Sequence, residues 1–571
     1  MTATAAQRPD AAAGDNTPMT HGQKIQALVG LLLGMFVAFL SSTIVSNALP
    51  VIITDLHGSQ DQYTWVVTAT LLASTATTPL WGKLSDLVSK KLLVQASLAV
   101  FTLGSVLAGF SQSVGMLIGF RVVQGLGLGG LQALVMIVIA SMFSPRERGR
   151  YQGPIAAVMS LAIVAGPLLG GVIVDTSWLG WRWTFYVCVP LAVIALAVIQ
   201  RTLNLPVIRK EVSLDYLGAV LIAGGVSTLL IWVTLAGKNF DWVSGMSFGL
   251  VVLGLALLAI AVFVESRAKD PIIPLHLFRD RTISLATIAS ISVGVALFGG
   301  AVFLGQYFQI ARGYSPTAAG LLTLPMVIGS MISATVSGQL ITRFGKWKRY
   351  LVVGAIAMAI GFGLLGTIDA HTNMVVIGGY LFIVGLGMGM TMQNLVLAVQ
   401  NNVEPAELGS ATSTVTFFRS LGGAAGVSVL GAVLSNHVTD LIKQGLAAVG
   451  IDPGQTGGAG LANLNELPGP IEAIVRGAYG DGTARVFLIA GIMAAISLVA
   501  IVFIKEVALK TESVDEQRMS EIADGATPSA TDDGHDDRRP ELVAVLETTD
   551  DPGSDAGVTP ARDHGEATTV R

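Results

Sequence analysis

The chain has 571 residues, of which 52% are hydrophobic and 13% are charged, and its formal net charge is −4. Soluble domains carry about 25% charged residues, so this composition argues against a soluble enzyme or a nucleic-acid-binding protein. Because Cys188 is the single cysteine, the chain can form neither an intramolecular disulfide nor a thiolate metal cluster.

Apolar stretches dominate the chain between Gln26 and Lys505. About fourteen of them approach the ~20 residues that cross a bilayer as a helix. The predicted spans begin near residues 26, 62, 91, 115, 152, 181, 214, 244, 283, 317, 350, 374, 409 and 483. We therefore predict an all-α integral membrane protein of two six-helix bundles plus two extra central helices.

The predicted organisation has five parts. Residues 1–25 form a disordered cytoplasmic N-terminus, and residues 26–205 form the N-terminal six-helix bundle. Residues 206–282 hold the two additional membrane helices and a cytoplasmic linker. Residues 283–504 form the C-terminal six-helix bundle with an outside loop at 437–482. Residues 505–571 hold 17 Asp and Glu against 7 Lys and Arg, a composition that predicts a disordered acidic tail.

The positions of Lys and Arg predict the orientation. With both ends placed inside, the inside loops and the N-terminus hold 19 of the 34 basic residues, whereas the outside loops hold six. Cytoplasmic loops of membrane proteins are enriched in positive charge. We expect a multi-pass protein of the cell (plasma or inner) membrane with both termini in the cytoplasm and an inner face against anionic lipid.

An internal repeat is visible in two motifs. Gly82–Lys91 aligns without gaps on Gly338–Trp347, which lies 256 residues later. Gly125–Gly129 recurs as Gly385–Gly389 after 260 residues. Repeated sets of helices are the usual construction of secondary transporters, so the repeat predicts two related halves with the seventh and eighth helices between them.

The order of the motifs carries a resemblance. Gly82–Lys91 is followed by Arg121–Gly130 in the fourth span and by Ala165–Gly171 in the fifth. This order resembles the major facilitator superfamily, and within it the fourteen-span drug/proton antiporters. Further matches are Trp181–Phe185, the Glu265, Arg267, Pro271, Pro274, Leu277, Phe278 pattern, Gly313–Gly320 and Arg419–Gly426. The resemblance implies a transporter that works by alternating access between two bundles.

The resemblance assigns gating to the first motif. It implies that Gly82 lets two helices approach and that Asp86 pairs with basic groups, with Lys90 and Lys91 in the same loop. The usual arginine and second glycine of this signature are Leu87 and Ser89 here. The alternative is a basic loop that only orients the protein, with a solvated aspartate.

The resemblance assigns proton coupling to Arg121 in the fourth span. An arginine inside a membrane costs at least about 2.5 to 3.5 kcal/mol, so it needs a partner or a task. A fixed positive charge would favour the ionised form of any carboxylate that approaches it. The alternative is an arginine hydrogen-bonded to helix carbonyls for structure alone.

The fifth span carries a motif found mainly in antiporters. Gly166, Pro167, Gly170 and Gly171 are predicted to belong to the gate, because a proline removes a backbone hydrogen bond and glycines allow close helix packing. The resemblance favours export over uptake. The alternative is a plain packing kink.

One departure from the family pattern bears on coupling. The fourteen-span branch has an aspartate shortly before Thr43-Ile-Val, whereas this chain has Ser41 at that place. On the predicted spans, no carboxylate lies deep in the membrane. Asp61 and Asp86 remain as candidate proton carriers, with solvation as the alternative for Asp61.

Polar side chains in the spans are candidates for a substrate cavity. They are Ser41, Ser42, Gln124, Gln306, Gln309, Gln393, Asn394 and Arg419. A cavity without a buried anion favours neutral or anionic amphiphiles, and Arg121 or Arg419 could meet an anionic group. The alternative for each is an ordinary hydrogen bond between helices.

Sites of other kinds are not visible. The sequence has no phosphate-binding Gly-x-x-x-x-Gly-Lys-Ser/Thr loop, no His or Cys set with metal-ligand spacing and no catalytic triad pattern. We predict no cofactor and no enzyme activity. The leading hypothesis is a monomeric, proton-driven exporter of small amphiphilic compounds, a multidrug efflux protein. The alternatives are an exporter of a lipid, siderophore or cell-envelope metabolite, and a non-transporting membrane sensor or scaffold.

Overall fold

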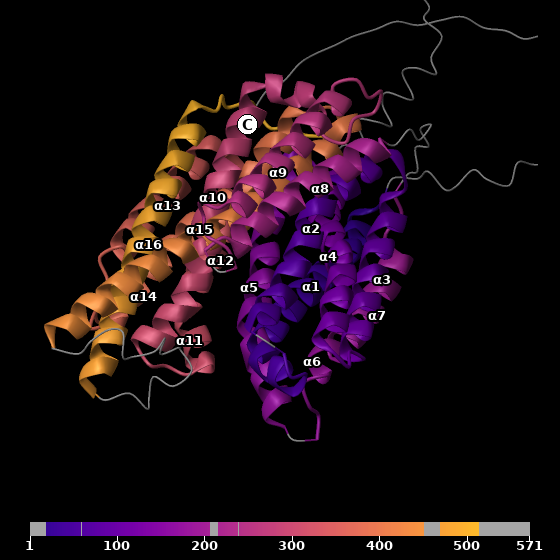
Figure 1. Cartoon of the computed structure of the whole chain (residues 1–571). Helices are drawn as coiled ribbons and strands as arrows, with labels where there is room; N and C mark the ends of the chain where they lie inside the picture. Colours follow the sequence, from indigo (N-terminus) through magenta and orange to yellow (C-terminus); the bar gives the residue numbers. More distant parts are fainter. Residues whose placement is uncertain are drawn as a thin grey trace, which may run out of the picture. The chain divides into compact units, whose positions relative to one another are not determined.

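A computed structural model describes residues 19–58, 60–176, 178–205, 215–237, 239–449 and 469–512. The described chain is helical, and its one β-bridge pairs Ala236 with Phe240. Thirteen of the described helices are long and apolar enough to cross a membrane. The helix α2 is a further long helix, with more polar residues, that packs among them (Figure 1).

The N-terminal bundle is built around two central helices. Among its members, α4 packs against α2 and α3, while α1 packs against α4, α5 and α7. The short helix α6 (Trp183–Tyr186) comes directly before α7. The helices are α1 (His21–Asp55), α2 (Gln60–Leu87), α3 (Lys90–Gly109), α4 (Val114–Met142), α5 (Pro145–Asp175) and α7 (Cys188–Thr202).

Two additional helices follow the first bundle. They are α8 (Tyr216–Leu235) and α9 (Gly245–Glu265), which pack against each other, and α8 also contacts α2 and α15. A 3-10 helix, η1 (Leu275–Arg279), connects them to the second bundle.

The C-terminal bundle repeats the arrangement of the first. In it α14 packs against α12 and α13, and α10 packs against α14, α15 and α16. Its long helices are α10 (Arg281–Gln306), α12 (Leu324–Phe344), α13 (Lys348–Leu365), α14 (Met374–Asn402), α15 (Leu408–Ala448) and α16 (Gly469–Phe503). Its short elements are the π-helix η2 (Tyr307–Ala311), α11 (Pro316–Leu322) and η3 (Pro405–Glu407). The predicted fold class, two six-helix bundles plus two additional helices, is confirmed.

The repeated glycines have matching roles in the two halves. A Cβ on Gly125 or Gly129 would collide with the backbone of α2, and one on Gly385 or Gly389 would collide with the backbone of α12. Glycine at these positions lets α4 and α14 lie directly against their neighbours. The internal repeat seen in the sequence is therefore a repeat in the packing.

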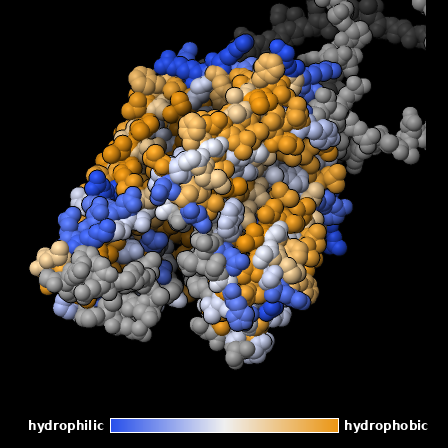
Figure 2. All heavy atoms as spheres, in the orientation of Figure 1, coloured by the Kyte–Doolittle hydropathy of each residue, from blue (hydrophilic) through white to orange (hydrophobic). Residues whose placement is uncertain are grey.

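The surface is divided by polarity. Figure 2 shows an apolar band over the middle of the helices and polar residues gathered at both ends. Along its length α9 exposes the apolar side chains of Phe248, Leu253 and Phe263. Contiguous exposed apolar surface of this kind is rare on water-soluble proteins, so the band is the surface that faces lipid.

Several predicted boundaries were wrong. Helix α1 begins at His21 rather than after residue 25, and α5 begins at Pro145 rather than near residue 152. Each of these helices has a capping box, formed by Thr20 with Gln23 and by Ser144 with Glu147, which satisfies free N–H groups in the first turn. The polar first turns hid both starts from a search for apolar residues.

The predicted outside loop at 437–482 is helical over 437–448 and 469–482. Helix α15 continues to Ala448, and α16 already begins at Gly469. Val438 on α15 and Ala478 on α16 pack in one apolar cluster with Phe303. Tertiary packing therefore extends both helices past the apolar segments that the sequence marks as membrane spans.

The first residues of the predicted disordered tail pack against the second bundle. The Oε1 atom of Glu506 accepts hydrogen bonds from the backbone N–H groups of Trp347 (3.0 Å) and Lys348 (3.1 Å). Lys510 N donates to Oδ1 of Asn401 (3.0 Å). Helix α13 has no cap from its own N-cap side chain, so Glu506 supplies the acceptor that its first turn lacks. The remainder of the tail, from residue 513, lies outside the described residues.

Candidate functional site

The two bundles meet at a close crossing of α2 and α15. A Cβ on Gly82 would collide with Ser413 and with the backbone of Gly409, and a Cβ on Gly409 would collide with Ser85 and the backbone of Gly82. The backbones of the two helices are therefore in direct contact. Glycine at both positions is the condition for this contact.

Asp86 fixes the same crossing. Its Oδ1 accepts a hydrogen bond from Gly409 N (2.8 Å), and its Oδ2 accepts from Ser410 N and Ser410 Oγ (both 2.8 Å). These are free N–H groups in the first turn of α15, where a negative charge is also favoured by the helix dipole. The sequence predicted basic partners for Asp86. The structure adds a helix N-terminus, and Lys90 contributes an electrostatic attraction.

A second crossing, between α5 and α12, has the same form. A Cβ on Gly149 would collide with Gly338 O, and one on Gly338 would collide with Gly149 O. Arg146 clamps this crossing, since its guanidinium donates to Thr342 O (3.0 Å) and Arg343 O (3.3 Å). Gly149 and Gly409 are 260 residues apart, so the two crossings are copies related by the internal repeat.

The copies differ at one position. Thr342 occupies in the second motif the place that Asp86 occupies in the first, 256 residues earlier. The hydroxyl of Thr342 donates to Gly338 O (3.0 Å) within its own helix. The acidic cap is thus present at the α2–α15 crossing and replaced by an arginine clamp at the α5–α12 crossing.

Buried polar side chains link the two crossings. Arg148, 6% exposed, donates to Phe143 O (2.9 Å) and, through Nη1, to Oε1 of Gln400 on α14 (2.5 Å). Gln400 Nε2 in turn donates to Oγ1 of Thr412 on α15 (3.1 Å). Nearby, Gln152 Nε2 donates to Oδ1 of Asn394 (2.7 Å). A continuous set of hydrogen bonds therefore joins α5, α14 and α15 at this end of the protein.

Sequence reasoning missed Arg148, Gln152 and Gln400 as site residues. It counted Arg148 among loop charges, because the fifth span was predicted to begin after it. The available signal was Gly149 and Gly153, spaced four residues apart, a pattern typical of closely packed helices. Both glycines do lie against α12.

Asp86→Asn is expected to loosen the α2–α15 crossing, because asparagine removes the charge and one of the two acceptor oxygens. A hydrogen bond to a charged group contributes about 1.5–3 kcal/mol, so opening should become about tenfold more frequent. The measurement is the maleimide labelling rate of a cysteine placed at half-buried Gln393 in a Cys188→Ala background.

Ser113→Ala is the matched control for this substitution. It removes an N-cap at the start of α4, at the opposite end of the bundle, where Ser113 Oγ accepts from Met116 N. Its labelling rate should equal that of the parent. Equal rates for Asp86→Asn and the parent would show that the aspartate does not hold the crossing closed.

The other predicted gating residues lie within the N-terminal bundle or beside it. Lys91 Nζ donates to Gln200 O (2.7 Å) and Asn204 Oδ1 (3.2 Å), which ties α3 to the end of α7. A Cβ on Gly166 would collide with Thr43 on α1. Gly170 is buried and Gly171 is half-buried, and the side chain of Pro167 lies outside the described residues. None of the contacts described for Lys91 or Gly166 reaches the second bundle.

Arg121 is the centre of a buried polar network in the N-terminal bundle. Arg121, 3% exposed, donates through Nε to Val66 O (3.2 Å) and through Nη1 to Oε1 of Gln124 (2.5 Å). Gln124 Nε2 donates to Ser105 Oγ (2.7 Å) and Ser41 Oγ (3.2 Å). The structure thus brings together Arg121, Gln124 and Ser41, which sequence reasoning had divided between coupling and the cavity.

The acceptors of Arg121 in the described structure are neutral. Ser41, at the place of the family's aspartate, accepts from Gln124 instead of supplying a charge. Asp61 belongs to α2, but its side chain lies outside the described residues. The guanidinium is therefore a buried cation with uncharged hydrogen-bond partners among the described residues, an arrangement that attracts any anion able to reach it.

The remaining cavity candidates are dispersed. Ser42, Gln306 and Gln393 are half-buried and Gln309 is exposed. Arg419 Nη1 makes a long contact of 3.5 Å with Met392 O on α14. Asn394 belongs to the hydrogen bonds between the bundles described above rather than to the Arg121 network.

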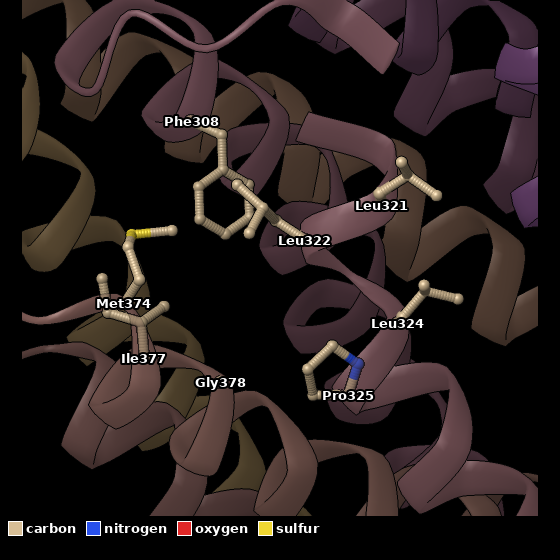
Figure 3. A pocket seen from close by; sticks show the side chains of 8 residues that line it. All are labelled: Phe308, Leu321, Leu322, Leu324, Pro325, Met374, Ile377 and Gly378. Carbon is tan, nitrogen blue, oxygen red and sulfur yellow. The ribbon is translucent and has the colours of Figure 1, made fainter. Parts of the chain in front are cut away.

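A pocket that the sequence did not predict lies in the second bundle, at the end opposite the crossings. Its volume is about 290 Å³, and its lining is apolar (Figure 3). The π-helical turn η2, α11 and the first turns of α12 and α14 surround it, with Phe308, Leu321, Leu322, Leu324, Pro325, Met374, Ile377 and Gly378 as lining residues. Helical periodicity gives no sign of a π-helical turn, which is why the pocket was missed.

The end opposite the crossings is hollowed between the bundles. Figure 2 shows a hollow between the two bundles at the lower end of the view, where α6 and α11 lie in Figure 1. The two crossings close the other end by direct helix contact. On one side of this hollow α11 of the second bundle contacts α5 of the first, where Gly171 lies near Thr317. The described structure is therefore closed at the Asp86 end and hollowed between the bundles at the opposite end.

The comparisons with known proteins identify the family. The sequence profile of the Major Facilitator Superfamily matches residues 31–427. The chain belongs to the Major Facilitator Superfamily. It is a multi-pass membrane transporter of this superfamily rather than an enzyme.

Similar proteins include two that are named for multidrug transport or resistance. Multidrug transporter protein MdtP of Bacillus subtilis (strain 168) is 36% identical over 419 residues, 73% of this chain and 77% of the relative. Multidrug resistance protein 3 of the same strain is 32% identical over 87% of this chain and 98% of the relative. The uncharacterized MFS-type transporter Rv1877 of Mycobacterium tuberculosis (strain ATCC 25618 / H37Rv) is 35% identical over 84% of this chain and 69% of the relative.

Solved structures of the superfamily share the fold. The proton:xylose symporter XylE aligns with a TM-score of 0.59 and 15% identity, covering 88% of this chain and 100% of the symporter. The human organic anion transporter MFSD10 aligns with a TM-score of 0.56 and 14% identity, covering 82% of this chain and 99% of that transporter. Identities this low carry the fold alone.

Proposed function

We propose that this superfamily member is a proton-driven secondary exporter of small amphiphilic compounds, a multidrug efflux protein. The observation that carries the proposal is the similarity to two Bacillus subtilis proteins named for multidrug transport or resistance, which extends over most of both chains. The motif in the fifth span, Ala165–Gly171, supports export over uptake.

The geometry supports alternating access. Two glycine crossings close one end, and a hollow between the bundles lies at the other. The basic loops gather at the closed end, and positive charge marks the cytoplasmic side. We therefore assign the Asp86 end to the cytoplasm of the cell, with both termini on that side, and the hollowed end to the exterior, where an exporter releases cargo.

The proposed coupling residue is Arg121. Its burial is costly, and its partners in the described structure are neutral, so its charge is available to a carboxylate or an anionic cargo group that enters the bundle. Asp61 near the start of α2 is the carboxylate proposed as its proton carrier. Protons flowing inward would then drive the return to the inward-open state.

The proposed cargo is a neutral or anionic amphiphile. The Arg121 network supplies hydrogen-bond donors without a buried carboxylate, and the apolar pocket beside Phe308 can accept a hydrophobic group. Ser42, Gln306, Gln309, Gln393 and Arg419 are the further polar side chains proposed to line the path.

The test is efflux of a panel of dyes and antibiotics from cells that express the full chain, and uptake into inverted vesicles, with and without a proton ionophore. Export that stops when the ionophore collapses the gradient supports the proposal. Gradient-independent export overturns proton coupling. Another outcome is that the correctly inserted protein moves no panel member while its deletion changes surface lipids. That result would favour export of a cell-envelope metabolite over multidrug efflux. A phenotype that depends on the tail without any transport favours the sensor.

A further inference from the structure

Two carboxylates meet beside the additional helices, outside the Arg121 network. Asp215 precedes α8, and its Oδ1 accepts a hydrogen bond from Gly218 N (2.8 Å) in the first turn of that helix. Glu265 ends α9, and its Oε2 accepts from Ile273 N (3.0 Å). Each carboxylate thus uses one oxygen to hold a backbone segment in place, and the backbone N–H of Ile272 also interacts with the Glu265 carboxylate.

The two remaining oxygens face the same small space. A Cβ on Gly218 would collide with both Oδ2 of Asp215 and Oε1 of Glu265, so both oxygens lie against the bare backbone of this glycine. Both atoms are buried, and neither has a hydrogen-bond partner within the described ranges. Glu265 as a whole is only 4% exposed. Buried polar atoms are rarely left without a partner, so this arrangement requires an explanation.

The charges around the pair do not neutralise it. Lys83, on α2, is the cation that faces Glu265, and it also lies 4.0 Å from Oδ1 of Asp270 in the segment after α9. Arg267 stacks instead on the ring of Phe263, 4.2 Å from its centroid. Among the groups described at this site, one ammonium group is therefore divided between Glu265 and Asp270. Adjacent like charges with little solvent are strongly unfavourable.

We propose that Asp215 and Glu265 share one proton between Oδ2 and Oε1, and so form a proton-binding site separate from the Arg121 network. A single O–H provides the hydrogen bond that both oxygens lack and removes one of the two opposed charges. A metal ion fits less well, because within the described ranges no group of three or more His, Cys, Asp or Glu side chains is placed to hold one. The inference does not depend on the proposed transport function.

The site lies where three parts of the protein join. It connects the start of α8, the end of α9 and the segment at Ile273, and Lys83 extends it to α2 beside Gly82 of the first crossing. With the proton bound, these parts are held together. Loss of the proton leaves two carboxylates opposed, which loosens the start of α8 from the end of α9.

The test uses the purified full chain in detergent and its melting temperature as a function of pH. A proton bound in the folded state but held less tightly in the unfolded state contributes stability at low pH that is lost as pH rises. The wild type should therefore lose stability on alkalinisation. Glu265→Gln should lose most of this pH dependence, because its amide N–H donates to Asp215 at every pH. Asp215→Asn should show the same loss, and its side-chain oxygen can still cap α8.

The double variant and a control complete the design. If one proton serves both groups, Asp215→Asn combined with Glu265→Gln flattens the profile no further than either single change, whereas additive changes overturn the shared proton. Asp280→Asn, which alters another helix cap at the start of α10, should keep the wild-type profile. A wild-type profile in Glu265→Gln overturns the proposal.

Infrared difference spectra between acid and alkaline pH test the wild type directly. The proposal expects a protonated-carboxyl band that disappears on alkalinisation, and that is missing from Glu265→Gln. The absence of any such band in the wild type overturns it even if a variant fails to fold. Stabilisation of the wild type alone by Mg²⁺ or Ca²⁺ would assign the pair to a cation instead, and would equally overturn it.

Discussion

Gly338→Val is expected to prevent closure at the α5–α12 crossing and to abolish transport. The added side chain would meet Gly149 O at a distance that real Cβ atoms do not show, and the atom in the way is backbone that cannot rotate aside. Overpacking at such a contact costs about 1–3 kcal/mol or more, enough to shift the balance between closed and open states by tenfold or more. Transport of any cargo that requires closure should fall to the background.

The measurement is the distance between spin labels at the exposed positions Arg150 and Arg343, on α5 and α12, in a Cys188→Ala background. Gly338→Val should shift the distribution to longer distances. Gly379→Val is the control, because a Cβ at that exposed glycine on α14 meets no atom within 4 Å. Unchanged distances with normal transport in Gly338→Val would show that the crossing does not need glycine.

Arg121→Ala is expected to lower the rate of gradient-driven export more than tenfold at equal expression. The change takes away the buried charge together with the donors to Val66 O and Gln124. Energy-independent exchange of labelled for unlabelled cargo should persist, because the cavity and the crossings remain. The measurement compares the two assays in the same vesicles.

The comparison separates coupling from structure. If both gradient-driven export and exchange are lost with a lower melting temperature, Arg121 is a structural residue. Ser105→Ala serves as the control, since it removes one hydrogen bond from Gln124 but leaves the Arg121 contacts in place. Unimpaired gradient-driven export in Arg121→Ala would remove the residue from the coupling mechanism.

The sequence was sufficient for the fold, because the membrane makes the apolar length of a helix its strongest signal. The repeated motifs also predicted the two halves, and the packing of Gly125 and Gly385 confirms them. The starts of α1 and α5 were wrong, because capping boxes are polar. The extensions of α15 and α16 were missed, because they depend on contacts between the two helices.

The contacts at the site were harder to predict. Arg148 and Gln400 are 252 residues apart, and a loop-like basic residue gave no sign that it would be buried against an amide on α14. The partner of Asp86 was missed for another reason. A helix N-terminus offers N–H groups and a positive potential without a charged side chain, so a search for basic residues overlooks it.

The construction of the crossings has a consequence for how such a transporter can change. Gly82 with Gly409, and Gly149 with Gly338, meet through main-chain atoms that every sequence possesses. The side chains described at these crossings, Asp86 and Arg146, are not among those proposed to line the cargo path. Substitutions that change cargo preference can therefore accumulate in that path without altering the closing motion. The same pair of helix crossings can then serve transporters of chemically unrelated cargoes.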